Sequence, residues 1–310
     1  ASFLHLQPMV AIVTNIDNDH LATHGGDFQK LRQSFVEFLH NLPFYGLAVL
    51  CADDPELSSL LPQVGRPIVS YGLAEHADVR AVDIRRAGSA THFSVLRKGH
   101  DPLPVTVNLP GMHNVLNSLA AIAVATDLAI ADGAIQRALE RFQGIDRRLQ
   151  VVGEVRPAGK ASITGASITV VDDYGHHPTE IAATLDALRQ AYAGRRIVLV
   201  FQPHRYSRTR DLMDDFARVL SEADTLLVTE VYAAGEAPIE GADARAMCRA
   251  VRGRGKVEPV FVPHVEQIAD SLAGLVRAGD VIAMMGAGSI SGVAHDLAAQ
   301  LTQRGIGGEA

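Results

Sequence analysis

The chain has 310 residues, a length typical of about two domains. Hydrophobic residues make up 47% and charged residues 20%, which excludes an intrinsically disordered protein, because disorder requires low hydrophobicity and a high density of charge. Lys and Arg number 28 against 35 Asp and Glu, a formal net charge of −7, so no nucleic-acid partner is expected.

The cysteine content and hydropathy suggest a compartment. Two cysteines in 310 residues are too few for a disulfide framework, which favours a reducing compartment, and we expect a cytoplasmic protein. No run of 18 or more apolar residues occurs, so no membrane-spanning helix and no membrane partner are predicted. We expect a monomer or a weak homodimer.

The first part of the chain mixes short strands with helices. The apolar runs at 9–14 and 47–51 predict buried strands, and apolar residues at helical spacing predict a helix over 27–40. Three further β-type segments predict an edge extension of the sheet: 67–70, 92–96 and 105–109. Two predicted helices follow, over 114–130 and 134–142.

Beyond the segment 144–148, strands and helices alternate regularly. The predicted strands are 167–171, 197–201, 225–229, 260–262 and 281–285. The predicted helices are 179–192, 210–221, 243–251, 265–276 and 291–302. Alternation of apolar, β-branched strands with helices predicts an α/β fold with a parallel sheet covered on both faces. We therefore expect two domains, 1–147 and 148–310.

Ligands of such sheets bind beyond the carboxyl ends of the strands, and this rule selects four segments. They are DDYGHHP (172–178), QPHRYSR (202–208), TEVYAAGE (229–236) and GAGSISG (286–292). The aspartates of the first could bind a ribose diol or a cation. The arginines and His204 of the second suit a carboxylate or phosphate, because guanidinium forks bind such anions bidentately. The alternative interpretation is a set of polar turns.

Two motifs in the first part also indicate binding. NIDNDH (15–20) follows a predicted strand, and its Asp and His could ligate a divalent metal; the alternative is a polar turn with a surface histidine. PGMHNVLN (110–117) begins a helix, with Asn114 and Asn117 three residues apart on one face. Their amides suit the edge of a heterocycle, although asparagine is also a good helix cap.

One glycine-rich segment does not fit a cofactor site. GAGSISG is one residue longer than the dinucleotide-binding fingerprint and follows the last predicted strand instead of the first, so we predict a tight turn. The phosphate loop G-x-x-x-x-G-K-[ST] occurs nowhere in the sequence.

Six segments, taken together and in order, closely resemble the Mur ligase family: TNIDNDH, PGMHNVLN, FQGIDRR, VDDYGHHPTE, FQPHRYSRT and MGAGSISG. The resemblance covers essentially the whole chain, and HHPTE with PHRYSRT is most similar to the alanine-adding branch. It implies that 1–147 is the later part of a mixed-sheet, P-loop-type ATPase domain without its phosphate loop. It also implies that 148–310 is a Rossmann-like C-terminal domain with a parallel-rich sheet.

The resemblance implies an enzyme that uses ATP and Mg²⁺ to ligate L-alanine to UDP-N-acetylmuramate through an acyl phosphate, in peptidoglycan precursor synthesis. By this resemblance, His20 would ligate magnesium. The residues implied for ATP are His113, Asn114, Asn117, Arg147 and Asp172. The residues implied for the substrate pocket are Tyr174, His176, His204, Arg205 and Arg208, of which His176, Arg205 and Arg208 would be catalytic.

The first residues, ASFLHLQPMVAIVTN, include no initiator Met and enter a buried strand almost at once. Together with the missing phosphate loop, this leads us to expect an N-terminally truncated chain with little ligase activity alone. The alternative function is a non-catalytic module that binds nucleotide or substrate and retains the ligase fold.

Overall fold

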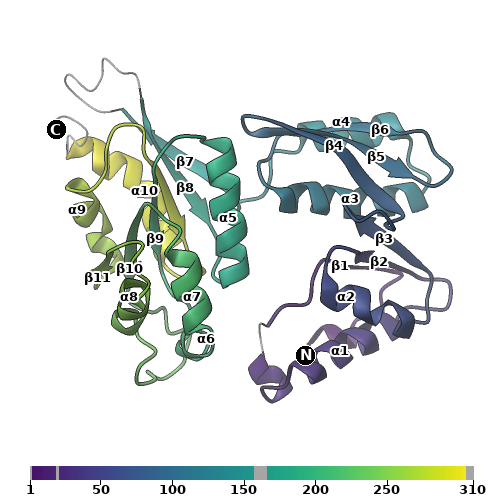
Figure 1. Ribbon diagram of the computed structural model, residues 1–310, viewed down its shortest axis with the longest axis horizontal. Coiled ribbons are helices and arrows are strands. Elements are labelled where there is room, and N and C mark those ends of the chain that lie inside the picture. The colour runs from purple at the N-terminus through teal and green to yellow at the C-terminus, as the bar shows by residue number, and fades with distance from the viewer. Residues whose placement is uncertain (1, 19–20, 157–165, 305–310) are drawn as a thin grey trace. The chain divides into compact units, whose positions relative to one another are not determined.

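The computed structural model describes residues 2–18, 21–156 and 166–304, and the chain forms two compact units, Ala1–Gln143 and Gly144–Ala310 (Figure 1). Arg147, the last residue of the predicted first domain, lies in the second unit. Its guanidinium donates a hydrogen bond of 2.9 Å to the carbonyl oxygen of Gly286 in that unit. Among the described residues no helix combines the length and apolarity needed to cross a membrane.

The first unit contains a mixed six-stranded sheet in the order β1-β2-β3-β4-β5-β6 (Figure 1). Its strands are β1 (Val10–Val13), β2 (Leu47–Cys51), β3 (Ile68–Gly72), β4 (Val79–Ala87), β5 (Ala90–Arg97) and β6 (Leu103–Val107). The pairings are parallel as far as β4 and antiparallel beyond it. We did not predict β4, because buried Val79 and Ala81 alternate with charged residues and its second half is mostly exposed.

Helices cover this sheet and share one hydrophobic core with it. They are α1 (Phe28–His40), α2 (Pro55–Leu60), α3 (Met112–Asp127) and α4 (Asp132–Arg141), with short 3-10 turns at Ser2–His5, Leu21–His24 and Leu61–Gln63. The α1 and α2 helices begin where a carboxylate accepts an orphan backbone N–H: Asp27 from Gln29, and Asp54 from Leu57. The largest buried side chains include Leu39, Tyr71 and Ile122.

The second unit contains a six-stranded sheet in the order β11-β10-β9-β12-β8-β7. Its strands are β7 (Gln150–Val155), β8 (Ile168–Asp173), β9 (Ile197–Phe201), β10 (Thr225–Thr229), β11 (Pro259–Val262) and β12 (Val281–Met285). All pairings are parallel except that of β7 with β8. The predicted α/β architecture is confirmed.

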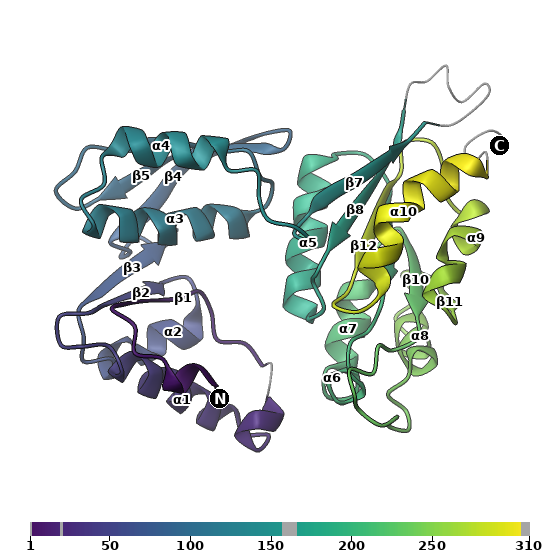
Figure 2. The same ribbon diagram turned by 180° about the vertical axis from the view of Figure 1, so that it is seen from behind.

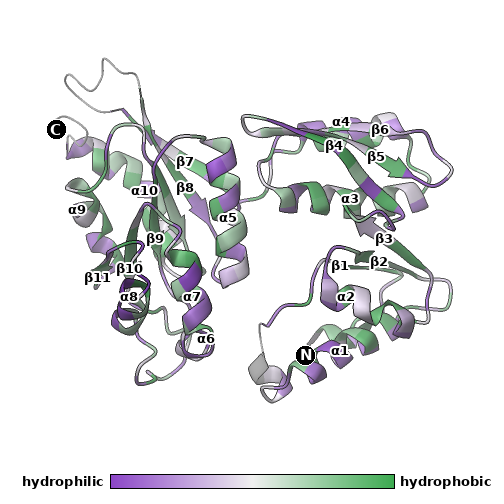
Figure 3. Cartoon of the chain, in the orientation of Figure 1, coloured by the Kyte–Doolittle hydropathy of each residue, from purple (hydrophilic) through white to green (hydrophobic). Residues whose placement is uncertain are grey.

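Helices cover both faces of this sheet (Figures 1 and 2). They are α5 (Pro178–Ala191), α6 (Tyr206–Asp211), α7 (Met213–Leu220), α8 (Ala244–Arg252), α9 (Ile268–Ala273) and α10 (Ile290–Gln303), with a 3-10 turn at Val265–Gln267. Alternate strand residues enter different cores: Leu199 packs with α5, α7 and α8, and Val200 with α9 and α10. Figure 3 shows these hydrophobic strands between the helices. Burial of both faces accounts for the continuous apolar runs.

The helix predicted over 210–221 is two helices in the structure. The α6 helix begins earlier, at Tyr206, and is separated from α7 by Leu212, whose φ of −117° is not helical. The prediction rested on the apolar spacing of the α7 segment. The first turn of α6 contains Tyr206, Ser207 and Arg208, which do not extend that apolar spacing, so its helical start was not predicted. The helix predicted over 265–276 is likewise a 3-10 turn followed by the shorter α9.

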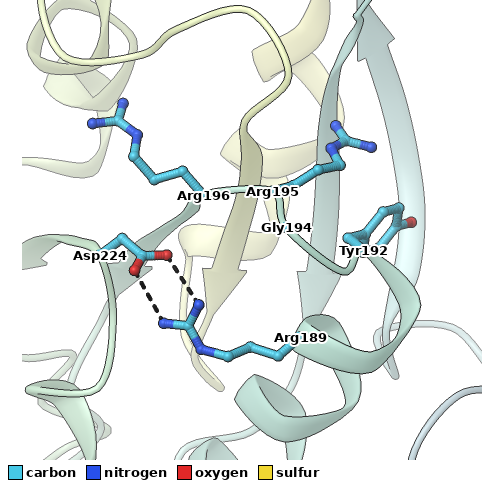
Figure 4. A pocket seen from close by; sticks show the side chains of 6 residues that line it. All are labelled: Arg189, Tyr192, Gly194, Arg195, Arg196 and Asp224. Atoms are coloured by element: carbon cyan, nitrogen blue, oxygen red, sulfur yellow. Dashed lines mark hydrogen bonds and ion pairs between the residues drawn. The ribbon is translucent and has the colours of Figure 1, made fainter.

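A pocket at the amino-terminal edge of the second sheet is lined by Arg189, Tyr192, Gly194, Arg195, Arg196 and Asp224 (Figure 4). Arg195 donates to the carbonyl oxygens of Ser167, Gly279 and Asp280. Arg196 donates to the Asp280 carboxylate, and Arg189 to that of Asp224. These guanidinium groups therefore hold the strand beginnings together, and the pocket is structural.

The absence of a side chain at Gly153 permits β7 to pack closely on α10. A Cβ atom built at Gly153 would lie 2.5 Å from the Cβ of Ala298, closer than real Cβ contacts. We expect Gly153→Ala to lower the free energy of unfolding of the second unit by about 1–3 kcal/mol, as overpacking does. Denaturant unfolding followed by circular dichroism measures the change.

The matched control is Gly292→Ala within α10, where a Cβ would meet nothing within 4 Å. Because alanine is favoured over glycine in a helix by about 1 kcal/mol, this variant should be as stable as the wild type or more so. Equal stability of Gly153→Ala and the wild type would contradict the packing argument.

Candidate functional site

The parallel strands of the second unit end level with one another. Met285 of β12 pairs with Asp173 of β8 on one side and with Phe201 of β9 on the other. The segments that begin at Tyr174, Gln202 and Gly286 therefore leave the sheet at the same edge. The loop after β10 joins them, because the amide of Tyr232 donates to Pro203 and that of Arg205 donates to Tyr232.

A row of four rings crosses this edge. The rings of Tyr174 and His176 lie edge to face at 5.1 Å, those of His176 and His204 are tilted at 5.5 Å, and those of His204 and Tyr232 stack at 5.6 Å. Three of these residues are sequence-predicted site residues. Tyr232 is an addition that spacing did not single out, although it lies in the TEVYAAGE segment selected by the strand-end rule.

His204 is held in its neutral form. Burial, together with the neighbouring His176, Arg208 and Arg205, lowers the pKa of His204 to about 4. Nη1 of Arg208 lies 3.2 Å from Nδ1 of His204, and a guanidinium can only donate. Nδ1 is therefore the acceptor, and the proton of the neutral ring is on Nε2.

Two sequence-predicted arginines flank His204 in different environments. Arg208 lies in the first turn of α6 and is only 8% exposed, whereas about half of the Arg205 side chain is exposed. Arg205 has a φ of +72°, a conformation rare for a residue with a side chain. Its carbonyl oxygen accepts from the amide and hydroxyl of Thr209, which fixes the start of α6.

The turn after β12 packs against the end of β9. The side-chain amide of Gln202 donates to Ser289, and its oxygen accepts from the amide of Ile290. A Cβ atom at Gly288 would collide with Gln202 and with the ring of Tyr232. The glycine-rich segment is thus the tight turn that we predicted, and its glycine makes room for the ring row.

The adjacent histidines His176 and His177 make different contacts. His177 is buried and forms the N-cap of α5, while Glu180 accepts from the amides of both His176 and His177. Burial would raise the pKa of Glu180, but those amides and the neighbouring His176 and Arg148 lower it overall. Nδ1 of His176 lies 2.9 Å from the carbonyl oxygen of Tyr174, which can only accept, so Nδ1 carries the proton of the neutral ring.

Asp173, one of the two aspartates considered for a ribose diol or a cation, instead accepts hydrogen bonds from the backbone at this edge. Its carboxylate accepts from the amides of Leu149 and Gly175 at 2.9 and 2.7 Å. Burial raises its pKa, although these two hydrogen bonds and Arg148 oppose the rise.

Asp172 and Arg147 form a second cluster at the same edge. The carboxylate of Asp172 is fully buried, and its Oδ2 accepts from Ser291 Oγ at 2.5 Å and lies 3.8 Å from Nε of Arg147. Its Oδ1 has no hydrogen-bond partner among the described residues, and neither does that Nε. The Arg147 guanidinium lies 4.6 Å from the Tyr174 ring centroid. A buried oxygen without a partner is costly, so Oδ1 is suited to an external donor such as a hydroxyl.

The other sequence-predicted residues lie in the first unit. His113, Asn114 and Asn117 occupy the first two turns of α3, whose N-cap Gly111 has a φ of +96°. The side-chain nitrogen of Asn114 donates to the carbonyl oxygen of Pro110 at 2.7 Å, which leaves its oxygen as an acceptor, and Asn117 is exposed. His20 lies outside the described residues, and no three His, Cys, Asp or Glu side chains among those described could hold a metal ion.

We expect NMR titration of the histidine rings to find His204 with a pKa of about 4, against 6.5 for an ordinary histidine. Between pH 4 and pH 6.5, His204 is therefore protonated to a greater extent in the unfolded chain than in the folded protein. The contribution of His204 to stability is complete above pH 6.5 and is lost as the pH falls towards 4. His204→Gln, which assigns the resonance by its loss, should weaken this acid destabilisation. An ordinary pKa for His204 would contradict the buried, cation-flanked environment.

Comparison with known proteins identifies the family. The Mur ligase middle domain matches residues 2–125, and the Mur ligase glutamate ligase domain matches residues 147–288. The chain is 56% identical over 305 residues to a UDP-N-acetylmuramate–L-alanine ligase from Burkholderia thailandensis. That alignment covers 98% of the chain and 64% of the relative, so the chain spans less than two thirds of that protein.

Solved structures of ligases of this family also resemble the chain. The UDP-N-acetylmuramate–alanine ligase MurC of Thermotoga maritima is 26% identical, with a TM-score of 0.75 over 97% of this chain and 61% of that one. A murein peptide ligase of Psychrobacter arcticus is also 26% identical, with a TM-score of 0.67 over 97% and 59%. A MurF ligase of Thermotoga maritima, solved in complex with ADP, shares the fold at 18% identity, with a TM-score of 0.69 over 96% and 62%. The chain belongs to the Mur ligase family.

Proposed function

We propose that the protein containing this chain ligates L-alanine to UDP-N-acetylmuramate at the expense of ATP, a step of peptidoglycan precursor synthesis. The observation that carries the proposal is the 56% identity, over 98% of the chain, to a UDP-N-acetylmuramate–L-alanine ligase. The site supports it, because two guanidinium groups and a neutral imidazole at one sheet edge suit a carboxylate and a phosphate.

Arg205 and Arg208 bind the carboxylate of L-alanine and balance negative charge that develops on the acyl group. Arg208 is buried and oriented by His204, whereas the more exposed Arg205 can reach an incoming amino acid. Neutral His204 adds no positive charge, so it orients Arg208 without repelling it. Fixed donors of this kind stabilise a transition state because they need no reorganisation during the reaction.

His176 is the group placed to take the proton of the attacking amine. Its Nδ1 donates to the carbonyl oxygen of Tyr174, so the unprotonated nitrogen of the neutral ring is Nε2. The edge of the Tyr174 ring fixes the plane of the imidazole. A base held in one tautomer is what general base catalysis requires.

The nucleotide fits the second cluster. The partnerless buried oxygen of Asp172 can accept from a ribose hydroxyl, and Arg147 beside it can meet a phosphate. For the adenine, His113, Asn114 and Asn117 of the first unit are proposed from the family resemblance alone. When bound, ATP supplies the phosphoryl group that activates the carboxylate of UDP-N-acetylmuramate. Magnesium is proposed from the family resemblance alone, with His20 as its ligand.

The role of Arg205 can be tested in the full-length protein. We expect Arg205→Ala to raise the KM for L-alanine or to lower kcat by at least about tenfold, since a hydrogen bond to a charged group is worth about 1.5–3 kcal/mol. ADP release at varied L-alanine measures both constants. Arg210→Ala is the control and should leave both constants unchanged, because Arg210 lies in α6 but is exposed and paired with Asp211.

We also propose that the 310 residues by themselves release little ADP in the presence of ATP, Mg²⁺, UDP-N-acetylmuramate and L-alanine. The reason is that the sequence contains no phosphate loop with its lysine. Turnover of roughly 10 s⁻¹, a typical enzyme rate, would overturn this proposal. A full-length protein that binds the substrates without releasing ADP would instead favour a binding module.

A further inference from the structure

Glu236 is the last residue of the TEVYAAGE segment in the loop after β10, where the sequence analysis assigned it no role, and its carboxylate reaches back to α6. It accepts from the amide of Ser207 at 3.0 Å and from the Ser207 hydroxyl at 2.7 Å. Its Oε1 lies 3.5 Å from Nη1 of Arg205. One carboxylate thus contacts both the first turn of α6 and the guanidinium of Arg205.

The loop is bent so that Glu236 can reach α6. Ala234 and Gly235 both have positive φ values, 49° and 85°, and the amide of Glu236 donates to the carbonyl oxygen of Ala233. A positive φ is unfavourable for alanine, so this turn is stable only because other contacts fix it. The bonds between Glu236 and Ser207 are such contacts.

The backbone of Arg205 is itself strained. Its φ of +72° and ψ of 136° lie outside the regions that residues with side chains prefer, at a cost of order 1–3 kcal/mol. Such a conformation persists only where the surroundings determine it. The loop after β10 holds this backbone at two points. The carbonyl oxygen of Tyr232 accepts from the amide of Arg205, and the carboxylate of Glu236 accepts from the amide of Ser207.

The ion pair restrains Arg205 and leaves it able to bind an anion. The contact with Glu236 involves Nη1, so Nε and Nη2 form the edge through which a carboxylate could be bound bidentately. Burial would raise the pKa of Glu236, but the two Ser207 donors and the Arg205 charge lower it overall, so the carboxylate is ionised at neutral pH.

We infer that Glu236 is a positioning residue for the amino-acid substrate, holding Arg205 in its strained backbone conformation and fixing the direction of its guanidinium. This inference rests on the proposed function, since it assigns Arg205 to the carboxylate of the amino acid. Glu236 acts through Arg205 and does not touch the substrate.

The test is a double-mutant cycle in the full-length protein. Glu236→Ala should raise the KM for L-alanine about tenfold, the loss typical of one charged hydrogen bond, while the KM for ATP changes less than twofold. Glu236→Gln, which retains an acceptor for Ser207 but loses the charge, should give a smaller rise. In an Arg205→Ala background the effect of Glu236→Ala should vanish, because the two residues act as a unit.

Glu258→Ala is the matched control, because Glu258 is an exposed acid paired with Arg252 elsewhere in the same unit. It should leave both KM values unchanged. The inference is overturned if Glu236→Ala has no effect on the KM for L-alanine, or if its effect is equally large with and without Arg205.

A crystal structure of the Glu236→Ala variant separates this inference from the proposed function. We expect Arg205 to leave the positive-φ region or its guanidinium to lose a single position. An Arg205 that keeps its φ and side-chain position without Glu236 would overturn the inference, whatever amino acid the enzyme uses. A wild-type protein that releases no ADP with L-alanine would refute only the proposed function.

Discussion

The pairing of β12 with both β8 and β9 is the constraint on which the candidate site depends. It aligns Asp173, Met285 and Phe201 at one level, so three chain segments far apart in sequence leave the sheet together. The register is firmly specified because both faces are buried: a slip of one residue would exchange the residues of the two cores. The site is thus positioned by apolar packing beneath it, although its own residues are polar.

Arginine has opposite tasks at the two edges of this sheet. At the amino-terminal edge, Arg195 and Arg196 donate to carbonyl oxygens and to Asp280, so their hydrogen-bonding capacity is used within the protein. At the carboxyl edge, Arg205 is held by a single long ion pair and keeps an edge for a ligand. The formal net charge of the chain sums all charged residues, so it does not distinguish the arginines of the two edges.

The strands that the sequence predicted well are those buried on both faces, such as β9 and β12, because a continuous apolar run leaves few alternatives. The strands it missed have one exposed face or a glycine. In β4, charged residues interrupt the apolar pattern. In β7, a glycine is needed at position 153 because Ala298 packs where its side chain would lie, and this glycine weakens the strand pattern. The break at Leu212 was also missed, since the apolar spacing there continues into α7.

The sequence by itself determined the alternation of strands and helices, and hence a parallel-rich sheet whose carboxyl ends carry Tyr174, His176, His204, Arg205 and Arg208. Only the tertiary structure decided what these residues can do. Burial beside cations makes His204 neutral, His177 is used as a helix cap, and Asp172 has an oxygen without a partner. Glu236 meets Arg205 and Ser207 across about 30 residues of chain. Protonation and orientation depend on desolvation and on neighbours brought together by folding, and no local pattern in the sequence records either.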